Sequence, residues 1–172
     1  DSILSIVPGT WEGKFIWAPK VIENPVGAGW LLYYTGADED VCQRIGVAFS
    51  SDLYNWVRSN ENPLYEPGRW ADWEEGQWAN CRDPEIVYQE TQETYYMLTT
   101  AKTTHNIGAL SLAASDDGLI WEDWGAPFLE NDDSLMVESS QMVRDESGLY
   151  HLFYHEEESD GTYHIANQSF LG

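Results

Sequence analysis

The sequence is poor in positive charge. Three lysines and five arginines stand against 30 acidic residues, which gives a net charge of −22 at pH 7. Such a chain repels polyanions, so nucleic acid and anionic membrane surfaces are excluded as expected partners. Neutral ligands and cations remain, and most of the acidic residues are expected to form a solvated, highly soluble surface.

Long apolar runs and cysteines are also scarce. No apolar stretch approaches the roughly 20 residues that a membrane helix needs, and 172 residues with 14% aromatics suffice for one soluble domain, 1–172. The two cysteines, Cys42 and Cys81, leave a disulfide and free thiols equally open. No signal peptide or lipidation motif is recognisable, and a start at Asp1 without methionine fits either a removed leader or a chain cut from a longer one. A secreted and a cytoplasmic location therefore both stay open.

No dedicated metal motif is present. Glu156-Glu157-Glu158 and Asp132-Asp133 are acidic clusters that could hold calcium, but neither has the alternating ligand spacing of a calcium loop. We expect no cofactor, with calcium at one of these clusters as the alternative.

What the sequence does contain is a repeat. The segments RIGVAFSSDLYNW (44–56) and ALSLAASDDGLIW (109–121) place Ser, Asp and Trp in the same register, 65 residues apart. The same offset relates residues 17–19 (Trp-Ala-Pro) to residues 82–84 (Arg-Asp-Pro). Each unit holds four short β-rich runs separated by Gly, Asn, Asp and Pro, which is typical of one four-stranded blade of a β-propeller. The predicted fold class is therefore an all-β propeller of four-stranded blades.

The units predict about three blades. Residues 17–80 and 81–136 form two whole blades, and residues 137–172 form a partial blade that ends before its Ser-x-Asp and Trp. Residues 1–16 resemble the exit of a blade and are expected to hold the last strand of a preceding one. Propellers typically carry about four to eight blades, so the predicted ring is incomplete.

An incomplete ring leaves unpaired strand edges. We expect the strand at Ile3–Val7 to pair with the last strand near Tyr163–Gln168, within one chain or between two. Open edges otherwise invite pairing with other chains. The sequence thus predicts self-association into a homo-oligomer that completes the propeller.

Candidate chemistry lies where the first strand of each blade lines the central channel. Side chains at the start of those strands converge on the propeller axis, and the corresponding slots hold residues 17–19, 82–84 and 138–140 (Glu-Ser-Ser). Asp83 and Glu138, from adjacent blades, are thus expected to face one cavity. Paired carboxylates suit cleavage of a glycosidic bond, one as an acid with a raised pKa and the other ionised. The alternative for Glu138 is a solvated residue before a strand.

These residues resemble the five-bladed propeller glycosidases of glycoside hydrolase families 32, 43 and 68, with similarity to the family 130 phosphorylases. The resemblance spans nearly the whole chain and is carried by Cys81-Arg82-Asp83-Pro84 and, about one blade later, by Val137-Glu138-Ser139. It implies that Asp83 orients the sugar and stabilises the transition state, that Arg82 binds sugar hydroxyls, and that Glu138 is the general acid/base. The implied partner is a carbohydrate, a furanoside such as a fructan or an arabinan.

The third carboxylate of those families, the nucleophile or base, has no counterpart here. The families take it from the first strand of the opening blade, whereas Ala18 fills the equivalent slot of the first whole unit and Lys20 stands where many arabinan-cleaving relatives carry Asp. We therefore expect this chain alone to be inactive or weak as a glycoside hydrolase. A non-catalytic carbohydrate-binding propeller and a purely structural propeller fragment are the alternatives, so enzymatic activity stays open.

Three further residues are predicted to bind substrate, namely Trp17, Trp78 and His155. The two tryptophans lie near the first strands and could stack on a sugar face, although core packing explains them equally well. His155 could border the channel, where a single histidine without a partner at ligand spacing is otherwise structural. The Arg82-Asp83 pair likewise has a structural interpretation, as an ion pair that satisfies buried backbone groups at a blade junction.

Overall fold

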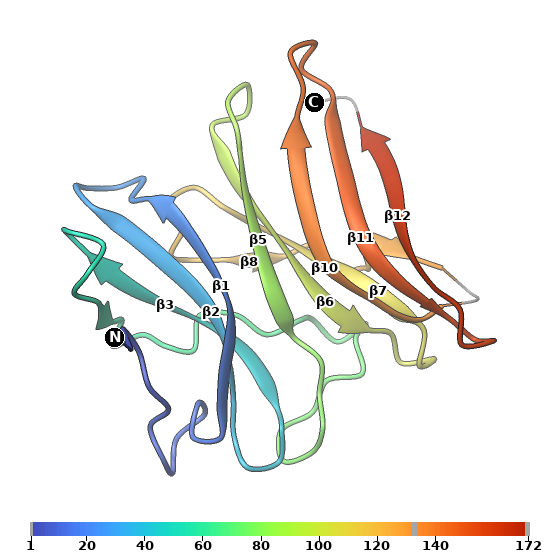
Figure 1. Ribbon diagram of the computed structural model, residues 1–172, viewed down its shortest axis with the longest axis horizontal. Coiled ribbons are helices and arrows are strands. Elements are labelled where there is room, and N and C mark those ends of the chain that lie inside the picture. Colours follow the sequence, from blue (N-terminus) through green and yellow to red (C-terminus); the bar gives the residue numbers. More distant parts are fainter. Residues whose placement is uncertain (1, 132–133, 171–172) are drawn as a thin grey trace.

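The computed structural model describes residues 2–131 and 134–170, which form strands, turns and irregular segments. Three antiparallel sheets lie side by side as a fan (Figure 1). The first sheet contains β1 (Phe15–Glu23), β2 (Trp30–Ala37), β3 (Gln43–Ser50) and β4 (Val57–Arg58); the second contains β5 (Arg82–Gln89), β6 (Thr94–Lys102), β7 (Gly108–Ser115), β8 (Glu122–Asp123) and β9 (Leu129–Glu130); the third contains β10 (Ser134–Arg144), β11 (Tyr150–Glu158) and β12 (Tyr163–Phe170). No helix that could cross a bilayer occurs among the described residues. The predicted all-β fold is confirmed.

The Ser-x-Asp motif of the repeat forms a turn. Ser50 Oγ accepts the Leu53 N–H at 2.9 Å, and Asp52 Oδ1 accepts the N–H groups of the next two residues at 2.8 Å each. Ser115 and Asp117 make the same bonds to residues 118–120. These side-chain oxygens take the place of backbone acceptors for N–H groups where the chain leaves the third strand of the sheet. The motif therefore has a structural role.

The first strand of each sheet carries the same irregularity. Ala18, Asp83 and Ser139 have positive φ angles of 51°, 58° and 56°, and the strand pairing shifts register at each of them. Left-handed φ costs a residue other than glycine on the order of 1 kcal/mol or more, and such a bulge re-aims the neighbouring side chains. The three slots predicted from the sequence therefore coincide with one recurring bulge.

Apolar side chains fill the two junctions between the sheets. Tyr33 and Met97 are fully buried in the first junction, while Leu98 and Leu152 are buried in the second. The Tyr33 hydroxyl also donates to the carbonyl oxygen of Gly118 at 2.5 Å, which ties the first sheet to the second. Alternate residues of one strand thus face opposite junctions, as the two-residue period of a β-strand requires.

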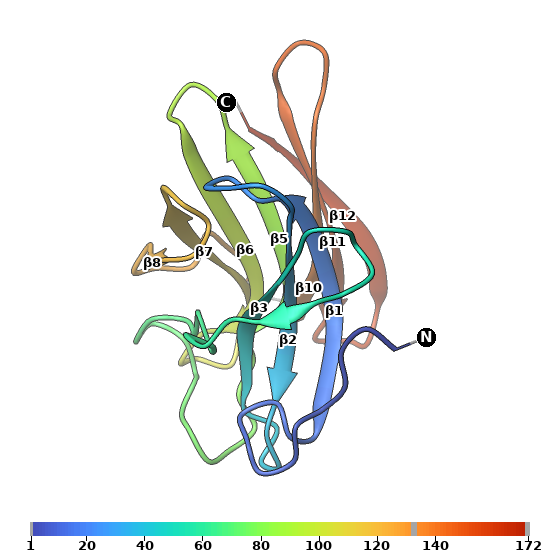
Figure 2. The same ribbon diagram turned by 90° about the vertical axis from the view of Figure 1, so that its left-hand side faces the viewer.

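The amino-terminal segment covers the free face of the first sheet. Leu4 and Trp11 pack against a buried cluster that includes Tyr34, and the rings of Trp11 and Tyr34 stack with centroids 5.9 Å apart. Arg58 binds Glu12, with 2.8 Å between Nε and Oε1. Figure 2 shows this segment beside β1. It occupies the side of the first sheet that faces away from the second sheet.

The strand expected at Ile3–Val7 is not formed. This segment has no strand pairing: Leu4 packs on the first sheet and the Ser5 carbonyl oxygen accepts a hydrogen bond from Arg58 Nη2 at 2.5 Å, while Ile3, Ile6 and Val7 are exposed. The expected pairing with Tyr163–Gln168 within one chain is also absent among the described residues, where β12 pairs with β11 alone. Figure 1 places the amino terminus and β12 at opposite ends of the fan. Pairing between two chains stays a prediction.

The two cysteines are free and buried. Burial raises the pKa of the Cys42 thiol to about 11 and raises the pKa of Cys81 even further above the ordinary thiol range. Since the thiolate is the reactive form, both side chains are inert packing groups at neutral pH.

Candidate functional site

Arg82, Asp83 and Glu138 meet near the start of β5 and β10. Arg82 Nη2 donates to Glu138 Oε2 at 2.5 Å, and Arg82 Nε lies 3.7 Å from Asp83 Oδ2. Their side chains are 12%, 17% and 28% exposed, in the order Arg82, Asp83, Glu138. The structure thus brings together the two predicted carboxylates, one from each of two neighbouring sheets, with a guanidinium between them.

Asp83 is bound to all three sheets. Its N–H donates to Thr35 Oγ1 at 3.1 Å, and its Oδ2 accepts from Thr100 Oγ1 at 3.1 Å and from the Ser139 N–H at 3.2 Å. Among the described residues, Oδ1 has no hydrogen-bond donor. One oxygen therefore fixes the carboxylate and the other is open to a ligand.

Two buried amides hold Arg82 in place. Its Nη1 donates to Asn80 Oδ1 at 2.6 Å and to Gln43 Oε1 at 3.3 Å, and these residues are only 5% and 2% exposed. Gln43 belongs to β3, so the guanidinium links all three sheets. Sequence reasoning missed both amides, although Asn80 lies only two positions before Arg82.

The environment of Glu138 favours its ionised form. Burial opposes ionisation, but the hydrogen bond and charge of Arg82 and a 3.0 Å contact of Oε1 with His155 Nδ1 outweigh it, so the pKa of Glu138 lies below its usual range. A general acid at neutral pH needs a raised pKa. The raised pKa expected for one of the paired carboxylates is therefore not found at Glu138 with Arg82 bound to it.

The other predicted ligands are placed differently. His155 contacts Glu138 and lies parallel to the ring of Tyr163, with centroids 5.5 Å apart. Trp17 is half-buried in the slot of the first sheet and packs edge-on against Phe15. Trp78 lies in the loop before β5 with 65% of its surface exposed, and it makes no recorded hydrogen bond or ring contact within the described part of the chain. Their roles in binding stay predictions.

Lys20 joins the first sheet to the second. Its Nζ lies 2.7 Å from Glu85 Oε2, and Glu85 Oε1 accepts the Met142 N–H of the third sheet at 3.2 Å. Glu85 is only 3% exposed and Lys20 is 29% exposed, so the ion pair is partly buried. Lys20 is thus engaged in a link between sheets, and the slot of the first sheet, with Ala18, supplies no carboxylate.

Of the two acidic clusters considered for calcium, the structure describes Glu156-Glu157-Glu158, and this cluster forms no recognisable metal centre with the other described residues. Across residues 2–131 and 134–170, no group of three or more His, Cys, Asp or Glu side chains converges. Glu156 instead accepts hydrogen bonds from Asn131 Nδ2 and Ser134 Oγ and contacts His164 Nε2. Asp132-Asp133 lies outside the described residues.

Glu156 and Glu138 together predict acid sensitivity. Burial opposes the ionisation of Glu156, but its hydrogen bonds prevail and its pKa, like that of Glu138, is lowered. A lowered folded-state pKa stabilises the protein above the unfolded value of about 4.3, and this contribution disappears as the pH falls through the folded value. We expect the free energy of unfolding, measured with urea from pH 6 to pH 3, to decrease below about pH 4.5.

A Glu156→Gln variant tests whether Glu156 causes part of this acid dependence of the free energy of unfolding. The variant is expected to lose part of the acid dependence, whereas Glu146→Gln, at an exposed site, keeps the original curve. Identical acid profiles for Glu156→Gln and the parent chain would contradict the assignment.

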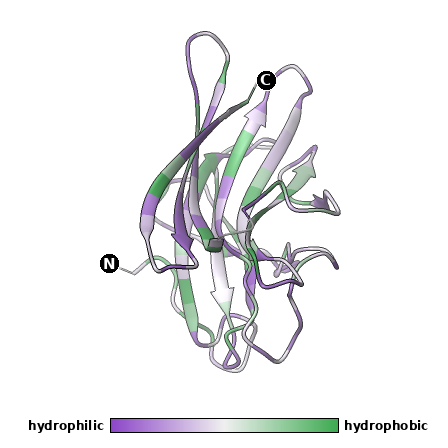
Figure 3. Cartoon of the chain, turned by 90° about the vertical axis from the view of Figure 1, so that its right-hand side faces the viewer, coloured by the Kyte–Doolittle hydropathy of each residue, from purple (hydrophilic) through white to green (hydrophobic). Residues whose placement is uncertain are grey.

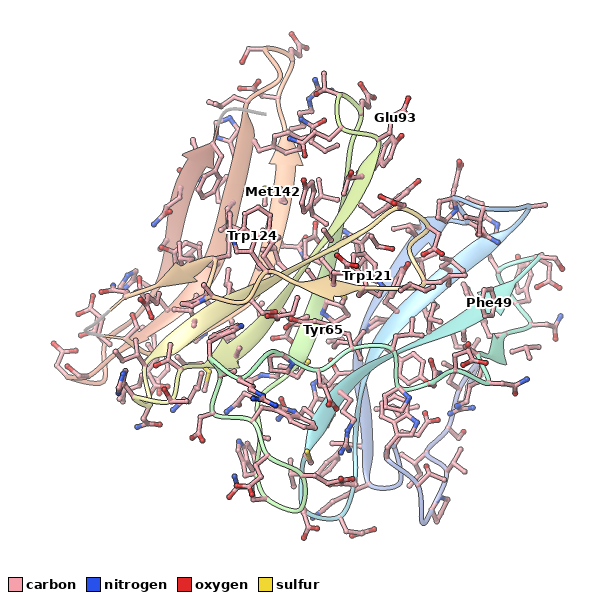
Figure 4. All side chains as sticks on the ribbon, turned by 180° about the vertical axis from the view of Figure 1, so that it is seen from behind. Phe49, Tyr65, Glu93, Trp121, Trp124 and Met142 are labelled. Atoms are coloured by element: carbon pink, nitrogen blue, oxygen red, sulfur yellow. The ribbon has the colours of Figure 1, made fainter. Side chains whose placement is uncertain are left out.

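Two cavities lie away from the carboxylates. One of about 450 Å³ opens between the second and third sheets and includes Trp124 and Met142 in its wall (Figure 4). Another of about 380 Å³ is bordered by Trp121 and Tyr65. Neither is lined by Arg82, Asp83 or Glu138. The carboxylate site is therefore separate from both cavities.

Four-stranded repeats, a shared bulge at the inner strands and carboxylates that meet there define a propeller of the glycosidase class. Residues 4–147 match the family described as "Glycosyl hydrolases family 32 N-terminal domain". The chain therefore belongs to glycosyl hydrolase family 32, and the expected resemblance to propeller glycosidases is confirmed.

One curated relative matches part of the chain. A β-1,2-mannobiose phosphorylase from Thermoanaerobacter sp. (strain X514) is 32% identical over 104 residues, which cover 56% of this chain and 32% of the relative. The chain thus spans about a third of the length of that curated relative.

Solved structures share the fold. One described as a glycoside hydrolase has a TM-score of 0.75 at 24% identity and matches 98% of this chain and 50% of its own. A family 32 β-fructofuranosidase from Bombyx mori has a TM-score of 0.72 at 18% identity, covering 96% of this chain and 36% of its own. An endo-arabinase from Bacteroides thetaiotaomicron VPI-5482 has a TM-score of 0.72 at 12% identity, covering 97% and 60%. The incomplete propeller expected from the repeats agrees with this partial coverage.

Proposed function

We propose that this chain recognises a furanoside-type carbohydrate, a fructan or an arabinan, through Arg82, Asp83 and Glu138. The observation that carries the proposal is the convergence of the two carboxylates on one guanidinium at the start of β5 and β10. The open Oδ1 of Asp83 can accept a sugar hydroxyl, and the N–H groups of Arg82 can donate to sugar oxygens. Relatives that act on fructans and arabinans share the fold, which supports this choice of substrate class.

The same contacts suggest how Glu138 becomes an acid. In the free site, Arg82 Nη2 holds Glu138 in its ionised form. A sugar hydroxyl that accepts from Nη2 withdraws this hydrogen bond, and this removes one of the interactions that hold the pKa of Glu138 down. Glu138 can then protonate the leaving oxygen, while Asp83 stabilises the positive charge that develops at the anomeric carbon. Substrate binding thus prepares the proton donor.

We further propose that this chain alone is inactive or weak in hydrolysis. The slot of the first sheet carries Ala18, and Lys20 beside it is paired with Glu85, so neither supplies a nucleophile or a base. Carbohydrate binding without hydrolysis is therefore the second candidate function of the chain. It uses the same residues as the first, Arg82, Asp83 and Glu138.

Binding and turnover are measured separately to test this function. We expect fructo- or arabino-oligosaccharides to bind in calorimetry, with little or no release of nitrophenol from aryl furanosides. Glu138→Gln is expected to retain the fold and measurable binding. Robust hydrolysis that is abolished in Glu138→Gln would prove the proposed inactivity wrong, and the absence of binding to either class of oligosaccharide would contradict carbohydrate recognition.

A further inference from the structure

A buried threonine stands beside the bulge in each of the first two sheets. Thr35 and Thr100 are 65 positions apart, as the repeat requires, and strand pairing places them opposite Trp17 and Arg82, the residues just before the bulge. Hydrophilic and hydrophobic stretches alternate along the strands (Figure 3), and these two polar side chains are fully buried. A buried hydroxyl costs free energy unless it is hydrogen-bonded, so each threonine is expected to have a partner nearby.

Between the first and second sheets, the partner of Thr35 is the backbone of Asp83. Thr35 Oγ1 accepts the Asp83 N–H at 3.1 Å. Asp83 has a φ angle of 58°, and the pairing of β5 with β6 passes from Arg82 directly to Glu85 and omits it. The hydroxyl of the neighbouring sheet therefore supplies an acceptor at the point where the pairing within the second sheet is interrupted.

Between the second and third sheets, the Asp83 carboxylate stands between the threonine and the next bulge. Thr100 Oγ1 donates to Asp83 Oδ2 at 3.1 Å, and the same oxygen accepts the Ser139 N–H at 3.2 Å. Ser139 occupies the bulge of the third sheet, with a φ angle of 56°. A threonine thus bonds the next bulge directly in the first case and through the Asp83 carboxylate in the second.

These bonds give the carboxylate one orientation. The Thr100 hydroxyl and the Ser139 N–H come from two different sheets and both bind Oδ2, and Arg82 Nε lies 3.7 Å from the same oxygen. Rotation of the carboxylate about its Cβ–Cγ bond would break both hydrogen bonds. Oδ1, which has no donor among the described residues, is therefore the oxygen left for a sugar hydroxyl. A binding group that is held in place before the ligand arrives loses less entropy on binding.

We propose that Thr35 and Thr100 are positioning residues for Asp83. Thr35 holds its backbone at the bulge, and Thr100 holds its carboxylate, so that Oδ1 is presented to the carbohydrate in a single orientation. This inference rests on the proposed function of the carboxylate site. It assigns a role in binding to two side chains that are fully buried and do not touch the sugar themselves.

Thr100→Val tests this role, because valine keeps the branched shape of the side chain and removes its hydroxyl. In calorimetric titrations of the whole chain with fructo- or arabino-oligosaccharides, we expect the affinity for the recognised class to fall about threefold to tenfold. Thr100→Ser keeps the hydroxyl and is expected to keep most of the affinity of the parent chain. Thr99→Val is the matched control and is expected to leave the affinity unchanged. Thr99 is also fully buried, but it points to the opposite face of β6, where it bonds the Ser111 hydroxyl at 2.6 Å.

Hydrogen exchange followed by NMR measures the same positioning without a sugar. In Thr35→Val the Asp83 N–H loses its acceptor, and in Thr100→Val the carboxylate is free to turn away from the Ser139 N–H. We expect each of these amide protons to exchange with solvent about threefold faster or more. Thr99→Val is expected to leave both exchange rates unchanged.

The two measurements separate this inference from the proposed function. If Arg82→Ala weakens binding while Thr100→Val keeps the parent affinity, or if Thr100→Ser loses as much affinity as Thr100→Val, the positioning role is wrong and the carboxylate site stands. If the parent chain binds neither class of oligosaccharide, carbohydrate recognition fails and the exchange rates decide alone. Faster exchange at Asp83 and Ser139 then supports the positioning, and unchanged rates overturn it. Urea unfolding shows whether each variant folds, and Thr100→Ala repeats the test if Thr100→Val does not.

Discussion

Arg82→Ala is expected to reduce carbohydrate affinity about tenfold to a hundredfold. Hydrogen bonds that involve a charged group contribute about 1.5–3 kcal/mol each, and this range corresponds to that loss of affinity. The variant also removes the only cation that contacts both Glu138 and Asp83 among the described residues. Calorimetric titration with the bound oligosaccharide measures the affinity, and carbon-13 NMR of the glutamate carboxyl groups follows the pKa of Glu138, which we expect to rise.

Two further arginine variants test whether the loss of affinity in Arg82→Ala is specific to the Arg82 guanidinium. Arg144→Ala removes a 48% exposed arginine that pairs with Glu90, and it is expected to leave affinity unchanged. Arg82→Lys is expected to rescue little, because one ammonium group cannot reach the acceptors of Asn80, Gln43 and Glu138 that the planar guanidinium serves. Parent-like affinity in Arg82→Ala would remove Arg82 from the binding site.

Trp11→Ala is expected to lower the free energy of unfolding by about 3–5 kcal/mol, which is typical of truncating a large packed aromatic side chain. The Trp11 ring stacks on Tyr34 and lies against Gly36 and Gly46, where an added Cβ would come within 2.3 and 2.6 Å of it. Both glycines therefore leave room for the indole. Urea unfolding of the parent chain and the variant measures the difference.

Trp124→Ala is the matched control, because it removes a tryptophan that is 63% exposed. We expect it to cost about 1 kcal/mol or less, as surface substitutions usually do. Equal losses in the two variants would show that the amino-terminal segment contributes no more to stability than a surface loop.

The sheets and the recurring slots could be predicted from the sequence, because the residues that form them recur in each repeat unit. The Ser-x-Asp turns and the positions of Ala18, Asp83 and Ser139 recur at corresponding places, so one unit explains the others. Residues outside the repeat were harder to place. Ile3–Val7 was expected to form a strand, but Leu4 packs on the first sheet and Arg58 binds the Ser5 carbonyl oxygen instead.

The electrostatics of the site could not be predicted from sequence spacing. The pKa of Glu138 depends on which of its neighbours comes within hydrogen-bond distance, and Arg82 and His155 do so through pairing across sheets and strands. Gln43 belongs to a different repeat unit from Arg82 and lies 39 positions away in the sequence. Such contacts arise from the packing of one sheet on the next, which a single repeat unit does not encode.

The amino-terminal cover gives the fan two unlike ends. At one end, Leu4 and Trp11 of the amino-terminal segment cover the free face of the first sheet. At the other end, the third sheet presents Phe153 and an unpaired β12 edge within the described part of the chain. If the amino-terminal segment keeps its cover, association through the third sheets of two chains is the alternative to the predicted pairing of Ile3–Val7 with Tyr163–Gln168. Two identical faces that meet in this way form a closed pair that cannot grow into a fibre. That pairing would remove the exposed Phe153 and the unpaired β12 edge from solvent in both chains.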